Sequence, residues 1–122
     1  MTQYLIAFNH EWVPELTEEE FQRAGKAVRA LRAEMQAAGV LIYTGGLDES
    51  APVFSVDASS GSALFTDGPF TETKEHVGGF AVVNVADEEA ARLWAGKVAV
   101  ACGWPQEVRR FRTRPGDEPE TA

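Results

Sequence analysis

Two segments with apolar side chains on both alternating faces constrain the fold of this chain most. Residues 3–8 read QYLIAF and residues 80–85 read FAVVNV, so neither shows the continuous polar face of a strand that borders water. We expect both to be inner strands of one sheet, covered on two sides. Each is followed by a helical pattern, which limits the possible topologies of the sheet.

The first helical pattern begins at Thr17. Apolar residues then recur three and four positions apart, which predicts an amphipathic helix with its inner stripe at Phe21, Ala24, Val28, Leu31, Met35 and Ala38. Thr17 and Glu20 have the spacing of a capping box, and Gly39 supplies a residue that can end the helix. Asp87 and Gly103 bound a second predicted helix, with its stripe at Ala91, Trp94, Ala95 and Val98.

The remaining patterns predict short strands. They cover residues 40–44, a hairpin formed by 53–56 and 63–66, and a last strand over 107–112. The order β-α-β, hairpin, β-α-β is that of an α+β, ferredoxin-like split βαβ fold with an extra β-hairpin, in which an antiparallel sheet carries both helices on one face. We expect a single domain over residues 1–112 and a flexible, acidic, Pro-rich tail over 113–122.

A sheet with both helices on one face leaves its other face bare. Because the two inner strands are apolar on both sides, the bare face would expose a large apolar patch in a monomer. A twofold homodimer that packs sheet on sheet is the commonest way to cover such a patch. We therefore predict a homodimer with a cleft beside the interface.

Charge and cysteine content limit the partners and the compartment. The net charge of −8 and the pI near 4.7 oppose nucleic-acid binding, which depends on Lys and Arg. Four arginines within residues 109–114 are a local exception, and they either offset the acidic surface or hold an anion or an acidic partner. No apolar run reaches the roughly 20 residues of a membrane span. The lone Cys102, which we expect to be structural, fits a cytoplasmic protein.

The run DGPFTETKE over residues 67–75 is the strongest local motif. Asp67 and Gly68 are a turn signal, and Gly78 with Gly79 allows a close approach of the backbone to a neighbour or a ligand. Two interpretations stay open. The run is either a rigid loop in which Asp67 bonds backbone amides, or a site wall that presents polar groups such as Glu72 and Lys74.

Two histidines are the first candidates for proton transfer, because the unperturbed pKa of histidine lies close to physiological pH. His10 follows the first inner strand, and with Asp67 it is our candidate acid/base pair. Candidate ligand-binding residues are Trp12, Glu72, Lys74 and His76. The alternative is that both histidines are ordinary loop residues. Their spacing matches no metal-ligand motif, and no Gly-rich phosphate loop is present, so we expect neither a metal nor an organic cofactor.

The DGPF run and the order of predicted elements resemble the DGPF, or YCII-related, domain family over roughly residues 1–112. The resemblance implies a dimeric α+β barrel and a possible link to an extracytoplasmic-function sigma factor. In the YCII-like branch, a histidine and an aspartate on the first helix look like a catalytic dyad. Val28 and Ala37 occupy the corresponding positions, counted back from Gly39, so activity that rests on that dyad should be absent here.

Three functions follow from these observations. The first is a homodimeric small-molecule-binding or auxiliary protein whose ligand lies beside the interface. The second is a cofactor-independent acid/base enzyme that acts on a small metabolite. The third, which the resemblance alone implies, is an interaction module linked to a sigma factor.

Overall fold

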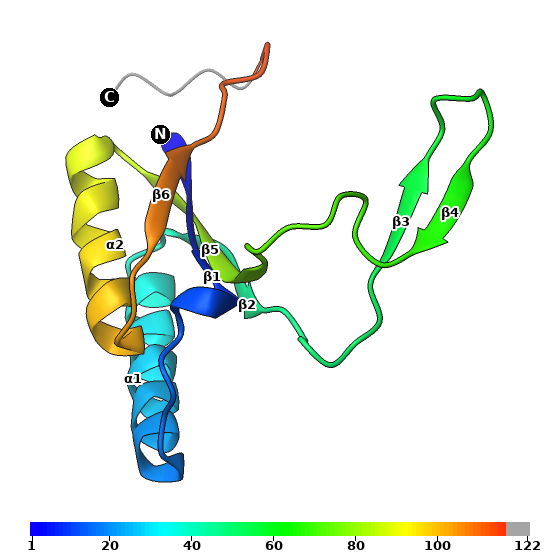
Figure 1. The fold of residues 1–122 in the computed structure, drawn as a ribbon. Coiled ribbons are helices and arrows are strands. Elements are labelled where there is room, and N and C mark those ends of the chain that lie inside the picture. The colour runs from blue at the N-terminus through cyan, green and yellow to red at the C-terminus, as the bar shows by residue number, and fades with distance from the viewer. Residues whose placement is uncertain (117–122) are drawn as a thin grey trace.

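The computed structural model describes residues 1–116 and has the predicted α+β, ferredoxin-like architecture (Figure 1). Its elements are β1 (Thr2–Asn9), the short 3-10 helix η1 (His10–Trp12), α1 (Glu18–Ala37), β2 (Leu41–Gly46), β3 (Phe54–Asp57), β4 (Leu64–Asp67), β5 (Val77–Val85), α2 (Glu88–Cys102) and β6 (Glu107–Arg110). An antiparallel sheet has the strand order β2-β5-β1-β6, and β3 pairs only with β4. Of the predicted tail, residues 117–122 lie outside the described residues.

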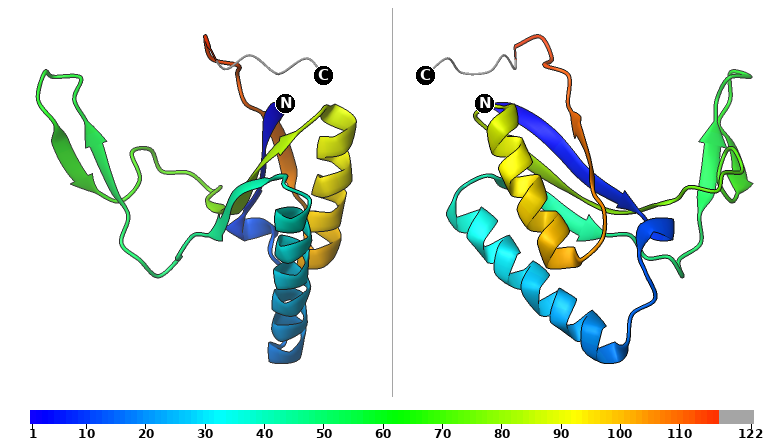
Figure 2. Two further views of the ribbon diagram at one scale, coloured as in Figure 1. Left: turned by 180° about the vertical axis from the view of Figure 1, so that it is seen from behind. Right: turned by 60° about the vertical axis from the view of Figure 1, so that its left-hand side comes forward.

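The two strands that are apolar on both faces occupy the inner positions of the sheet, as predicted. Register places Ile6 opposite Ala81 and Tyr4 opposite Val83, and all four side chains are buried on the face that carries the helices. Both helices cover this one face (Figure 2). The core is completed by Leu31, Met35, Val85, Ala91 and Ala95.

Both helices begin and end where the sequence predicts. The Thr17 side chain accepts a hydrogen bond from the Glu20 amide, and the Glu20 side chain accepts one from the Thr17 amide, each at 3.1 Å, so the capping box is present. Asp87 caps α2 in the same way by accepting from the Ala90 amide at 2.8 Å. Gly39 and Gly103 adopt φ of 70° and 93°, a left-handed conformation that favours glycine and ends each helix.

The N-terminal half of α1 departs from the predicted core. Leu31 and Met35 are buried, but Val28 is 37% exposed and Phe21 is 61% exposed, so their assignment to the core is wrong. With 20 residues α1 is longer than the 15-residue α2, by about 7 Å at 1.5 Å per residue. The first turns of α1 therefore run past the end of the sheet (Figure 1), and their apolar stripe borders a cavity.

The face of the sheet opposite the helices has no covering element within residues 1–116. Register places Leu5 opposite Val82 and Ala7 opposite Phe80 on this open face, and all four are only partly buried. The predicted bare, apolar sheet face is therefore present in the single chain.

The hairpin β3–β4 forms where predicted and projects away from the body of the molecule (Figures 1 and 2). We call residues 47–76 the arm. Its two ends are fixed to the sheet, because the Leu47 amide donates to the Gly78 carbonyl and the His10 amide donates to the His76 carbonyl, both at 2.8 Å. Beyond these ends, β3 and β4 hydrogen-bond only to each other within the two sheets described.

Candidate functional site

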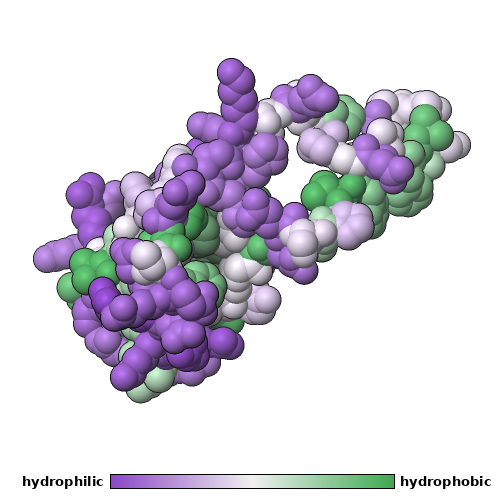
Figure 3. All heavy atoms as spheres, turned by 60° about the horizontal axis from the view of Figure 1, so that its bottom comes forward, coloured by the Kyte–Doolittle hydropathy of each residue, from purple (hydrophilic) through white to green (hydrophobic). Residues whose placement is uncertain are grey.

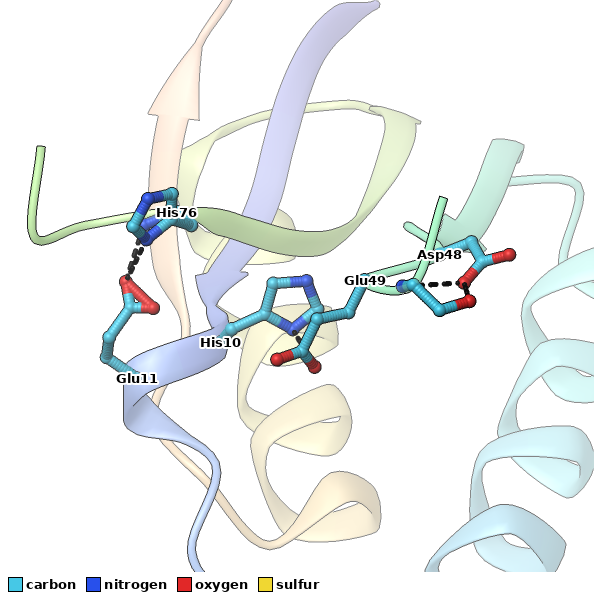
Figure 4. Close-up of polar contacts among 6 residues, drawn as sticks. His10, Glu11, Asp48, Glu49 and His76 are labelled. Atoms are coloured by element: carbon cyan, nitrogen blue, oxygen red, sulfur yellow. Dashed lines mark hydrogen bonds and ion pairs between the residues drawn. The ribbon is translucent and has the colours of Figure 1, made fainter. Parts of the chain in front are cut away.

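His10 lies at the end of β1 against a glycine of the neighbouring strand. The register of β1 and β5 shifts between Phe8 and Asn9, and a Cβ added at Gly78 would lie 3.0 Å from the His10 Nδ1 atom. Nδ1 is 3.6 Å from a carboxylate oxygen of Glu49, which is itself highly exposed (Figure 4). His10 thus pairs with Glu49 rather than with Asp67.

His76 forms a separate pair with Glu11 of η1 (Figure 4). The Glu11 Oε1 atom accepts a hydrogen bond from the His76 amide at 2.5 Å and lies 3.2 Å from the His76 Nδ1 atom. Desolvation raises the pKa of Glu11, but the hydrogen bonds from the amide and ring of His76 outweigh it, so the pKa is lowered overall. This pair holds the end of the arm to η1.

Replacing Glu11 with glutamine should therefore destabilise the protein at neutral pH but not in acid. Because the pKa of Glu11 is lower in the folded than in the unfolded protein, its ionised form contributes stability above the unfolded pKa of about 4.3. That contribution is lost as the pH falls through the folded pKa. Melting temperatures of the wild type and Glu11→Gln should converge on acidification. Glu15→Gln is the control, and a pH-independent difference for Glu11→Gln would contradict the assignment.

The other motif residues do not gather around His10. Asp67 ends β4 on the arm, opposite Phe54. Within residues 1–116, the side chains of Asp67, Glu72 and Lys74 make no hydrogen bond or ion pair, so the interpretation in which Asp67 bonds backbone amides is not supported. Gly68 does form the turn, with φ of 91°.

Gly78 and Gly79 lie inside β5, and their role is internal packing. A Cβ at Gly78 would approach the Phe8 ring at 2.7 Å, and one at Gly79 would approach that ring at 2.9 Å. The close approach that the sequence predicted is therefore made to a neighbouring side chain of the same chain.

A polar cleft of about 260 Å³ lies on the open face of the sheet. It brings Trp12 together with the motif, but through Thr73 and Glu75 rather than Glu72 and Lys74. The Arg109 guanidinium also lines it and donates to the Glu107 carboxylate at 2.9 and 2.6 Å. Because this arginine is already paired, the cleft offers little free charge to a ligand.

A second candidate site is an apolar cavity of about 360 Å³ on the helix side, which the sequence analysis did not predict. It lies between the overhanging part of α1, the end of the sheet and the segment after α2. Apolar side chains dominate its wall, and they include Ile6, Phe8, Phe21, Val28, Met35 and Ala81. The first members of the α1 stripe, Phe21, Ala24 and Val28, line it, and the periodicity of the sequence did not indicate that they border a cavity.

Trp104 lines this cavity and carries an unsatisfied polar group. Its ring meets Phe8 edge to face, with centroids 5.5 Å apart. Its Nε1–H is buried and has no hydrogen-bond partner within residues 1–116. A buried donor without an acceptor costs roughly 1–3 kcal/mol. Trp94, on the predicted inner stripe of α2, packs against the core.

The titratable groups around the cavity are cationic or neutral. Arg29 and Arg32 line it, and neither has an ion-pair partner within residues 1–116. The Arg29 Nη1 atom lies 3.3 Å from where a Cβ of Gly25 would be. Burial raises the pKa of the Cys102 thiol, which also lines the cavity, so this thiol stays protonated at neutral pH. No histidine or carboxylate is among the lining residues.

Metal binding and membrane insertion find no support in the described part of the chain. No group of three or more His, Cys, Asp or Glu residues that could hold a metal ion occurs there. Nor does any helix within residues 1–116 combine the length and apolar character needed to cross a membrane.

The sheet order, the two helices on one face and the inserted hairpin define a ferredoxin-like α+β protein. A family model described as the YCII-related domain matches residues 4–103. The chain therefore belongs to the YCII-related domain family, as the resemblance of its motif predicted. A search of the curated proteins found no match to this chain.

Proposed function

We propose that this YCII-related protein is a homodimer that binds a small, largely apolar molecule in the cavity beneath α1. The observation that carries the proposal is an apolar cavity of about 360 Å³ that has in its wall the ring of Trp104 and two arginines without ion-pair partners within residues 1–116. Small-molecule sites in proteins are typically apolar, roughly 300–1,000 Å³ in volume, and carry a few polar groups that orient the ligand.

The polar groups define the class of ligand. Trp104 contributes a flat aromatic ring to the wall, and Arg29 and Arg32 add hydrogen-bond donors and positive charge. A flat apolar molecule with an oxygen acceptor and an anionic group matches this combination. The ligand we propose is therefore an aromatic carboxylate or a molecule of similar chemistry.

Binding is favoured over acid/base catalysis by the composition of the wall. General acid/base chemistry needs a group that exchanges protons near neutral pH, and neither an imidazole nor a carboxylate lines the cavity. The predicted pair of His10 and Asp67 is not assembled within the chain. The enzyme and sigma-factor alternatives stay predictions.

The homodimer is supported by the open face of the sheet. Leu5, Ala7, Phe80 and Val82 form an apolar surface that a single chain leaves partly exposed. A second sheet packed on it would remove this surface from water. The polar cleft with Trp12 would then lie beside the interface, and the ligand site on the opposite, helix side.

The test is a titration of the wild-type protein with 2-naphthoate, followed by isothermal calorimetry. Val28→Phe should fill the cavity and weaken binding about tenfold or more, equivalent to about 1.4 kcal/mol. The matched control is Val100→Phe, because Val100 is 85% exposed on α2 and does not line the cavity. Equal binding by the two variants would overturn the cavity assignment, as would no binding by the wild type.

Sedimentation equilibrium at micromolar concentration tests the proposed homodimer. A measured mass equal to that of one chain would overturn it.

A further inference from the structure

The arm is amphipathic although it packs against nothing in its own chain beyond its two ends. Val56 lies opposite Phe65 and Phe54 opposite Asp67, so one face of the hairpin carries Phe54, Val56 and Phe65, with Asp67 at its end. Phe54 is 67% exposed and Phe65 is 69% exposed. Ser55, Asp57 and Thr66 lie on the other face, with Leu64.

A hairpin of this kind needs a second surface that buries its apolar side chains. A two-stranded hairpin alone in water is marginally stable at best, and contiguous exposed apolar side chains mark a docking surface. The apolar surface continues into the motif, where Phe70 is 78% exposed. Figure 3 shows hydrophobic side chains along the arm, beyond the body of the molecule.

The charge of the arm indicates what covers it. The arm is acidic: it carries one lysine, Lys74, and one histidine, His76, against the carboxylates of Asp48, Glu49, Asp57, Asp67, Glu72 and Glu75. A complementary surface must therefore combine apolar and basic side chains.

That combination occurs at the β6 edge of the sheet. β6 is an edge strand with one pairing partner, β1, and its other edge is open. Val108, opposite Ile6, is 40% exposed on the same side of β6 as Arg110, and Arg109, Phe111 and Arg112 follow along the chain. The arm of the same chain extends away from its own β6 (Figures 1 and 2).

We propose that the arm of each subunit docks on the β6 edge of a second copy of the chain. The apolar face with Phe54 and Phe65 packs on Val108, and the arm carboxylates face Arg110, on the same side of β6, and Arg112. Twofold symmetry makes the exchange reciprocal, so both arms and both β6 edges are covered at once. This inference rests on the proposed homodimer and adds the surface that joins the subunits.

The first test is the double variant Phe54→Ser/Phe65→Ser. Loss of two buried rings should raise the dissociation constant of the dimer by about a hundredfold or more. The matched control, Leu93→Ser/Val100→Ser, removes two exposed apolar side chains from α2 and should leave dimerisation unchanged. Sedimentation velocity over a concentration series measures both. A dimer that is equally tight in both variants would overturn the arm exchange while leaving the homodimer and the ligand site intact.

The second test addresses the charges and the position of the arm. Arg110→Glu/Arg112→Glu should weaken the dimer strongly at low salt and less at about 1 M salt, where the Debye length is about 3 Å. Hydrogen exchange should show the amides of residues 54–57 and 64–67 protected in the dimer and less protected in this variant. Unchanged protection and an unchanged dissociation constant would overturn docking at the arginines. A wild-type chain that is monomeric at all concentrations would overturn both this inference and the proposed homodimer, but not the binding of 2-naphthoate.

Discussion

Replacing Ile6 with alanine should destabilise the fold by about 2–5 kcal/mol. Ile6 is 1% exposed at the centre of the sheet, opposite Ala81, and it also lines the cavity beneath α1. Truncation removes apolar contacts and adds empty volume that the rigid strands around it fill only in part. Urea denaturation followed by circular dichroism measures the loss.

Ile42→Ala is the matched control for this prediction. Ile42 is 50% exposed at the irregular register between β2 and β5, so the same change should cost less than about 1 kcal/mol. Similar losses at the two positions would show that the buried face of the sheet has been assigned incorrectly.

Replacing Gly78 with alanine should destabilise the protein by about 1–3 kcal/mol. The new Cβ would lie 2.7 Å from the Phe8 ring and 3.1 Å from the His10 backbone nitrogen. The ring can rotate away, but the His10 amide is held by its hydrogen bond to the His76 carbonyl, so the backbones of η1 and β5 must separate. His10 adjoins the arm, and Phe8 lines the cavity. Hydrogen exchange should therefore become faster at the base of the arm and beside the cavity. Urea denaturation measures the accompanying loss of stability.

Gly96→Ala separates this steric effect from the general cost of replacing glycine. Gly96 lies on the exposed face of α2, and a Cβ there meets no atom within 4 Å. Since alanine favours helix more than glycine does, this variant should be more stable by about 0.5–1 kcal/mol. A neutral or stabilising Gly78→Ala would mean that Phe8 and His10 do not pack on β5 as described.

The fold could be predicted from the sequence because its signals are local. The capping box at Thr17, the left-handed glycine at Gly39 and the apolar strands 3–8 and 80–85 each determine an element within a few residues. Pairing of the inner strands then follows from the order of the elements. The structure confirms this part of the analysis.

The candidate site could not be predicted in the same way, because it depends on distances between elements. Whether Val28 lies in a core or beside a cavity depends on how far α1 extends past the sheet, which periodicity does not show. Likewise, His10 meets Glu49 through the path of the arm, while Asp67, expected beside it, is carried away on β4. Sequence proximity to the motif therefore did not indicate which side chains meet.

The hydrogen bond between the Leu47 amide and the Gly78 carbonyl has an evolutionary consequence. It closes the base of the arm between β2 and β5, which are already neighbours in the sheet, so the sheet imposes no length on the chain between them. Doubling the length of a flexible loop adds only about 0.6 kcal/mol of closure entropy. The arm can thus change in length and sequence among homologous chains while the four-stranded sheet and its two helices stay the same. The surface that the arm presents to a partner can therefore evolve independently of the fold.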